Sequence, residues 1–154
     1  MPTKTPAKKE DATKKETAKS VAKTERYFYA VGRRKTAVAK IKLYPSKEEK
    51  STLSVNDKMA DKYFPIERLW EIAAAPLGLM GDSKFRVVVK VSGSGVSAQA
   101  EAVRLGIARA LVISDETFKK TFKDMGYLTR DPREVERKKP GLKKARKSPQ
   151  WAKR

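Results

Sequence analysis

The side chains best able to do chemistry in this sequence are cations, and the chemistry they suit is the binding of phosphate groups. The chain has 37 Lys and Arg against 18 Asp and Glu, with no Cys and no His. The absence of Cys and His excludes disulfides, thiolate nucleophiles, imidazole acid–base pairs and most zinc sites. A hydrolase would then need paired carboxylates or a Ser/Lys arrangement, whereas the acidic residues are scattered, mostly among lysines. The sequence therefore predicts a protein that is not an enzyme and uses no metal and no cofactor.

The most strongly charged segment is 137–154, RKKPGLKKARKSPQWAKR, which has nine Lys or Arg and no acidic residue. Its only large apolar residues are Leu142 and Trp151, so it cannot bury enough surface to offset its ordering entropy, and its like charges repel. We expect a tail that becomes ordered against a polyanion, and RNA is the polyanion predicted. A membrane surface is disfavoured because the tail is not amphipathic and carries no lipidation motif.

A second group of cations, Arg33, Arg34 and Lys35, follows a glycine between two strand-like runs. In the second run apolar residues alternate with polar ones, which predicts a half-buried strand over 37–43. Arg34, Lys40 and Lys42 share parity, so we expect all three to project from the face opposite the core. A surface that only keeps the protein soluble is the simple alternative. The cluster at 33–35 together with the lysines at 40 and 42 on one strand face nevertheless favours phosphate binding.

The turn Gly93-Ser94-Gly95 joins the strand predicted over 85–91 to a helix predicted over 96–113. Such a turn offers free backbone N–H groups and the positive end of the helix dipole to a phosphate. It is not a Walker A loop, because no Gly-Lys-Ser/Thr follows. The alternative is a tight turn in which Ser94 or Ser97 caps the helix, and an RNA phosphate fits both interpretations.

The predicted helix over 96–113 carries two arginines, Arg104 and Arg109, outside its apolar stripe. They are expected to be solvated, paired with Glu101, or in contact with RNA. Gly106 lies inside this helix, where glycine costs up to about 1 kcal/mol relative to alanine. Close approach of the helix to a sheet would explain it.

The order of predicted elements indicates an α+β fold, a two-layer α/β sandwich with a small mixed sheet packed on helices. We expect a disordered Lys-rich extension over 1–25, a globular RNA-binding domain over 26–126 and an extended basic tail over 127–154. No apolar run is long enough to span a bilayer, and the N-terminus lacks the apolar core of a secretory signal. We therefore expect a cytoplasmic protein with no membrane partner.

Four stretches together resemble one family, the bacterial-type ninth protein of the small ribosomal subunit. They are AVGRRKTAVA at 30–39, QAEAVRLGIARAL at 99–111, LTRD at 128–131 and VERKKPGLKKARK at 135–147, and the terminal Lys153-Arg154 also matches. The resemblance covers about 27–154. The chain departs from the family around the glycine turn, where Ser97-Ala98-Gln99 stands in place of the usual Ser-Gly-Gln. Two other hypotheses, a small phosphotransferase using the glycine turn and a DNA-compacting protein, fit these stretches less well.

The resemblance implies a structural protein that binds 16S-type rRNA in the head of the small subunit, beside neighbouring head proteins. It also implies that the tail reaches the anticodon stem-loop of the peptidyl-site tRNA, with Lys153 and Arg154 as its tRNA-binding tip. The resemblance, together with the glycine turn at 93–95 and the lysines on one face of the strand over 37–43, predicts a set of rRNA-binding residues. They are Arg33, Arg34, Lys35, Lys40, Lys42, Gly93, Ser94, Gly95, Arg104, Arg109, Arg130, Arg133, Arg137, Lys138, Lys139, Lys143, Lys144, Arg146 and Lys147. No small-molecule substrate is implied.

Overall fold

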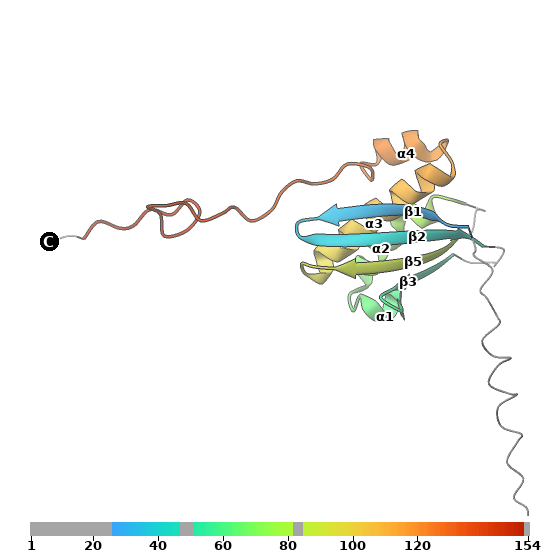
Figure 1. The fold of residues 1–154 in the computed structure, drawn as a ribbon, viewed down its shortest axis with the longest axis horizontal. Helices are drawn as coiled ribbons and strands as arrows, with labels where there is room; N and C mark the ends of the chain where they lie inside the picture. Colours follow the sequence, from blue (N-terminus) through green and yellow to red (C-terminus); the bar gives the residue numbers. More distant parts are fainter. Residues whose placement is uncertain (1–25, 47–50, 82–84, 153–154) are drawn as a thin grey trace, which may run out of the picture.

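Five strands form one mixed sheet in a computed structural model that describes residues 26–46, 51–81 and 85–152 (Figure 1). The sheet order is β1-β2-β5-β3-β4. Neighbouring strands are antiparallel except β3 and β5, which are parallel. Their bounds are β1 Phe28–Arg34, β2 Ala37–Pro45, β3 Thr52–Val55, β4 Lys58–Met59 and β5 Phe85–Ser92. The strand β5, distant in sequence from β2, therefore lies directly beside it.

The longest helix, α3 (Val96–Ser114), packs on one face of this sheet, and α2 (Glu67–Gly78) packs beside α3 on the same side. Figure 1 views the sheet from the opposite side, where no helix crosses it. Two short helices, α1 (Ala60–Tyr63) and α4 (Phe118–Asp124), lie at the edges. The predicted two-layer α+β sandwich with a mixed sheet is confirmed.

The core lies between the sheet and α3 because alternate residues of the central strands are apolar. In β2 and β5 every second side chain is buried, which is the period of a strand with one covered face. From α3, Val103, Ile107 and Leu111 are fully buried against them. Their four-residue spacing keeps them on one helix face. The same alternation leaves Lys40 and Lys42 of β2 and Arg86 and Lys90 of β5 on the uncovered face.

Two glycines let α3 approach β1 more closely than any side chain would allow. A Cβ atom on Gly32 would lie 1.8 Å from the Ala102 carbonyl oxygen and 2.6 Å from the Gly106 nitrogen. One on Gly106 would lie 2.5 Å from Ile41 Cδ1 and 2.9 Å from the Gly32 nitrogen. The close approach predicted from Gly106 is confirmed, and Gly32 is its partner on the sheet.

After α4 the chain continues as an extended segment without helix or strand through residue 152 (Figure 1). The expected extension over 1–25 and the tip residues Lys153 and Arg154 lie outside the described residues. Among the helices that are described, none is long and apolar enough to cross a membrane.

Candidate nucleic-acid interface

The uncovered face of the sheet carries a row of exposed cations, which we call the open face. In the sheet, Lys40 of β2 pairs with Lys90 of β5. Two residues away on the same face of β2, Val38 pairs with Arg33 of β1. The open face comprises Arg33, Lys40, Lys42, Arg86 and Lys90, all exposed. None of the five strands that the structure describes contains an Asp or Glu. None of these strands therefore contributes a carboxylate that could pair with Lys40, Lys42 or Lys90 on this face.

Tyrosine rings lie among these cations. Tyr29, paired with Lys42 in the sheet, is 48% exposed. The Lys42 Nζ atom lies 4.9 Å from the ring centroid of Tyr27, and the Arg86 guanidinium lies 4.9 Å from that of Tyr44. Cations interleaved with exposed aromatic rings suit a surface that binds nucleic acid, since the rings can stack on bases while the cations neutralise phosphates.

Arg86 and Lys90 were not among the predicted binding residues, although the sequence contains a signal for them. Phe85, Val87 and Val89 alternate as buried residues, so the residues between them had to face outward. What the sequence did not reveal is that β5 is the neighbour of β2. That neighbour relation is what joins Lys90 to Lys40 in one row.

The expectation that Arg34 projects with Lys40 and Lys42 was wrong. Arg34 pairs with Ala37 across the β1–β2 hairpin, and directly paired residues point to the same side of a sheet. Ala37 is fully buried on the helix side. The two turn residues Lys35 and Thr36 shift the alternation, so even-numbered residues of β1 face the helices while those of β2 face outward.

Arg34 instead joins three parts of the chain. Its Nε atom lies 2.5 Å from Glu101 Oε2 of α3, and Nη2 lies 3.0 Å from Asp131 Oδ2. Its Nη1 donates to the Arg133 carbonyl oxygen at 2.5 Å. We call these four residues, Arg34, Glu101, Asp131 and Arg133, the tail anchor. Only 11% of the Arg34 side chain is exposed.

The carboxylate of Asp131 is held in its ionised form within the tail anchor. Both the side chain and the backbone N–H of Arg133 donate hydrogen bonds to it, and the charge of Arg34 adds to their effect. These interactions hold the pKa of Asp131 well below its ordinary value. The anchor therefore contains a stable negative charge beside Arg34 at neutral pH.

Arg104 and Arg109 are half-buried and bonded within the body. Arg109 Nη1 donates to the Val31 carbonyl oxygen at 3.0 Å, and the Arg104 guanidinium lies 5.2 Å from the ring centroid of Tyr127. The Nε atom of Arg104 is buried and has no hydrogen-bond partner among the described residues. Pairing of either arginine with Glu101, one of the expected alternatives, was wrong, because Glu101 pairs with Arg34.

The Gly93-Ser94-Gly95 turn lies against the β1–β2 turn. A Cβ atom on Gly93 would lie 2.4 Å from the Thr36 carbonyl oxygen, so the structure brings together two motifs that the sequence shows far apart. Gly95 is the N-cap residue of α3 and no side chain caps it, so capping by Ser94 or Ser97 was wrong. The turn is closed instead by Gln99, whose Nε2 donates to the Gly93 carbonyl oxygen at 3.1 Å.

The described cations of the basic tail are exposed, whereas Tyr127 and Leu128 at its start pack against the core. One ion pair, Arg146 with Glu136, folds part of it into a loop, in which the Lys143 N–H also donates to the Lys147 carbonyl oxygen at 2.7 Å. The hydrogen bond from Arg146 lowers the pKa of Glu136. The predicted tail residues that are described, all exposed, are Arg130, Arg133, Arg137, Lys138, Lys139, Lys143, Lys144, Arg146 and Lys147.

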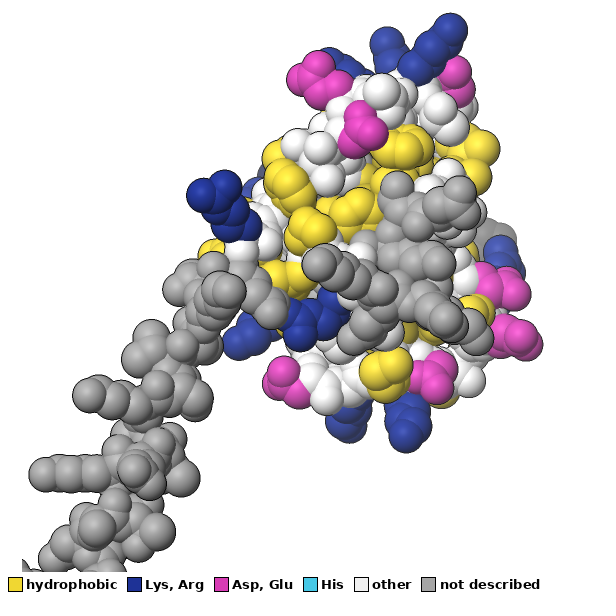
Figure 2. All heavy atoms as spheres, turned by 90° about the vertical axis from the view of Figure 1, so that its right-hand side faces the viewer, with side chains coloured by type: hydrophobic (Ala, Val, Ile, Leu, Met, Phe, Trp, Pro, Cys, Tyr) yellow, Lys and Arg dark blue, Asp and Glu magenta, His cyan; other side chains and the backbone are white. Residues whose placement is uncertain are grey.

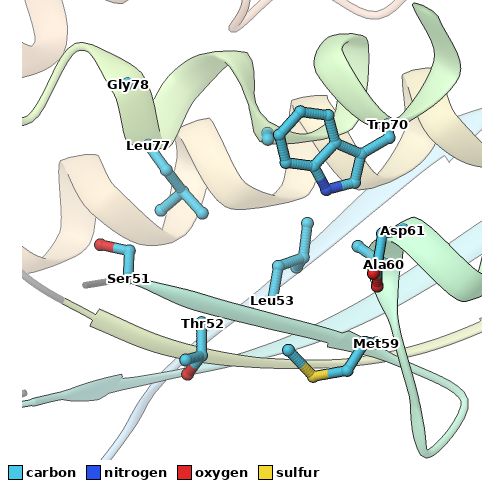
Figure 3. Close-up of a pocket in the computed structure, with 10 residues that line it drawn as sticks. Ser51, Thr52, Leu53, Met59, Ala60, Asp61, Trp70, Leu77 and Gly78 are labelled. Carbon is cyan, nitrogen blue, oxygen red and sulfur yellow. The ribbon is translucent and has the colours of Figure 1, made fainter. Parts of the chain in front are cut away.

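Two other parts of the described surface lack this segregation of charge. Figure 2 shows the side of the molecule on the right of Figure 1, where cations and carboxylates both surround a hydrophobic area. A groove of about 550 Å³ between α2 and β3 is lined mainly by apolar side chains such as Leu53, Trp70 and Leu77, with one carboxylate, Asp61 (Figure 3). Its lining has no cation and does not suit a phosphate.

The family model for ribosomal protein S9/S16 matches residues 32–154. The match begins at Gly32, the glycine of the close β1–α3 contact, and includes the whole open face, the tail anchor and the whole basic tail. It covers most of the chain. The protein therefore belongs to the ribosomal protein S9/S16 family, and is a ribosomal protein of the small subunit that takes part in translation.

Proposed function

We propose that this protein binds 16S-type rRNA in the head of the small ribosomal subunit, as a structural component of the cytoplasmic ribosome. The observation that carries the proposal is the segregation of charge. The strands contain no acidic residue, their uncovered face bears five exposed cations, and residues 137–152 add seven more without an acidic side chain. Cations arranged in this way bind a polyanion by neutralising phosphates and releasing counterions.

Within the body, the contacts with rRNA come from the open face and from the adjoining turns. Lys35 and the Gly93-Ser94-Gly95 turn lie at the same end of the sheet, because Gly93 packs against Thr36. A phosphate bound there would meet both a cation and free backbone N–H groups. The rRNA contacts predicted for Arg104 and Arg109 stay predictions, although both side chains already contact an acceptor or a ring of the protein itself.

The tail supplies the remaining contacts and extends the reach of the protein beyond its body. Its described cations are exposed, and we propose that it threads between rRNA segments. We further propose that Lys153 and Arg154 contact the anticodon stem-loop of the peptidyl-site tRNA. In support, the family match extends to residue 154.

The body interface is tested by binding of the full-length protein to a head-domain rRNA fragment at several salt concentrations. We expect Lys40→Ala/Lys42→Ala/Lys90→Ala to reduce the slope of log K against log salt by about 2, since each phosphate contact contributes roughly 0.7–0.9. The matched control removes three exposed lysines of α4, Lys119, Lys120 and Lys123, and should leave the slope nearly unchanged. Equal slopes for the two triple variants would contradict the assignment of the open face.

The tail tip is tested by the dissociation of peptidyl-site tRNA from reconstituted small subunits. Lys153→Ala/Arg154→Ala should leave assembly intact and accelerate tRNA release, with each exposed charge contributing about 1 kcal/mol or less. Lys143→Ala/Lys144→Ala is the control for loss of two tail charges elsewhere. Release rates that match those of the wild-type protein would contradict a tRNA contact at the tip.

A further inference from the structure

The tail anchor connects segments that are far apart in sequence. Arg34 is 67 residues from Glu101 and 99 residues from Arg133, yet its guanidinium group contacts both. The three nitrogens of the guanidinium contact three different residues. Two of these contacts are to carboxylates, so the charge of Arg34 is already compensated within the protein. Such a side chain is poorly placed to serve as a phosphate ligand.

One of the contacts fixes the main chain of the tail. The Nη1 atom of Arg34 donates to a backbone carbonyl oxygen, that of Arg133. Asp131 is fixed in turn, because the Arg133 N–H donates to its Oδ1 at 2.9 Å and the Arg133 guanidinium binds both of its oxygens. Residues 131–133 therefore form a closed turn, and Arg34 holds this turn on the end of β1 and on α3.

Beyond this turn, no hydrogen bond or ion pair joins residues 134–152 to the body among the residues that the structure describes. The ion pair and hydrogen bonds of residues 134–152 are made within the tail itself. Figure 1 shows the segment leaving the region of α4 and running past the end of the β1–β2 hairpin, away from the domain. The last tail residue that is bonded to the body determines from which point the following segment can move and what distance it can span.

We infer that Arg34 is a positioning residue, which fixes the direction in which the basic tail leaves the body instead of contacting RNA itself. Holding the tail in one exit direction lowers the entropy lost when it binds. The consequence for RNA rests on the proposed function, whereas the anchor itself is a property of the free protein. Arg33 provides a matched comparison, because it is the adjacent arginine, carries the same charge and lies exposed on the open face.

The anchor is tested directly by a distance measurement in the full-length protein. Because the chain contains no Cys, spin labels can be attached to cysteines introduced at Lys62 of α1 and Ser148 of the tail, both exposed. We expect Arg34→Ala to broaden the distribution of distances between the labels, while Arg33→Ala leaves it unchanged. Asp131→Asn should also broaden the distance distribution. Because this variant keeps the Arg34–Glu101 pair, it provides the same test if Arg34→Ala fails to fold. Unchanged distributions in the folded variants would overturn the inference.

The RNA readout separates positioning from direct contact. Arg34→Ala should weaken binding of the head-domain rRNA fragment while leaving the slope of log K against log salt unchanged, because no phosphate contact is lost. Arg33→Ala should reduce that slope by about 0.7–0.9. If Arg34→Ala reduced the slope equally, Arg34 would be a phosphate ligand and the inference would be wrong. Failure of the wild-type protein to bind RNA would contradict the proposed function, while the label distances would still decide on the anchor.

Discussion

Replacing Gly32 with alanine would disrupt the contact that places the open face and the tail anchor relative to α3. The added Cβ atom would lie 1.8 Å from the carbonyl oxygen of Ala102, whereas ordinary van der Waals contact begins at 3.4 Å. The helix and the strand would have to separate by about 1.6 Å, the difference between these distances. The opposing atom belongs to the main chain of a buried helix, so no side-chain rotation relieves the overlap.

The expected loss of stability follows from the rigidity of these atoms. Overpacking a core costs about 1–3 kcal/mol and occasionally more, and we expect Gly32→Ala to lie at the upper end, near 3 kcal/mol. For a domain of 60–100 residues, each kcal/mol shifts the melting temperature by about 4–8 °C. The variant should therefore melt roughly 12–24 °C below the wild-type protein, with thermal unfolding followed by circular dichroism.

Two other glycines provide the comparison. A Cβ atom on Gly106 would meet the terminal methyl of Ile41 at 2.5 Å and the Gly32 nitrogen at 2.9 Å. Because this backbone overlap is much smaller than the 1.8 Å contact at Gly32, Gly106→Ala should be less destabilising. At Gly78 nothing lies within 4 Å, and because Gly78 is in α2, alanine there should increase stability by up to about 1 kcal/mol. A Gly32→Ala variant that melts within about 4 °C of the wild-type protein would refute the reasoning.

Two further predictions concern the start of the tail. Because the native pKa of Asp131 is lowered, the anchor should be intact above the ordinary pKa of about 3.9 and should weaken as pH falls below it toward the native pKa. The label distances should thus be constant from pH 7 to 5 and broaden in stronger acid, and a distribution independent of pH would contradict this. Tyr127→Leu should lower the free energy of unfolding by about 1–2 kcal/mol in a denaturant titration, since it loses the Arg104 contact and the Phe122 ring pair. Tyr127→Phe keeps both contacts and should behave like the wild-type protein.

The amino-acid sequence was sufficient for features that depend on local pattern. Alternation in 37–43 and 85–91 predicted two strands, each with one apolar face, and the spacing of apolar residues predicted α3. The acid-free composition of 137–154 predicted an exposed basic tail, because a segment with two large apolar residues cannot form a core. Gly106 predicted a close helix–sheet contact, because glycine destabilises a helix relative to alanine and such a contact explains why it is present.

Only the tertiary structure decided which of these patterns share a surface. Alternation places residues on the two faces of one strand, but the register of the hairpin decides how the faces of adjacent strands match, and so Arg34 faces α3 instead of joining Lys40. Sheet order is likewise non-local, and it places Lys90 beside Lys40. The contact of Arg34 with Asp131 and Arg133 spans almost a hundred residues, with no periodicity in the sequence to indicate it. Local periodicity thus determined the elements, while pairing between distant segments determined the open face and the tail anchor.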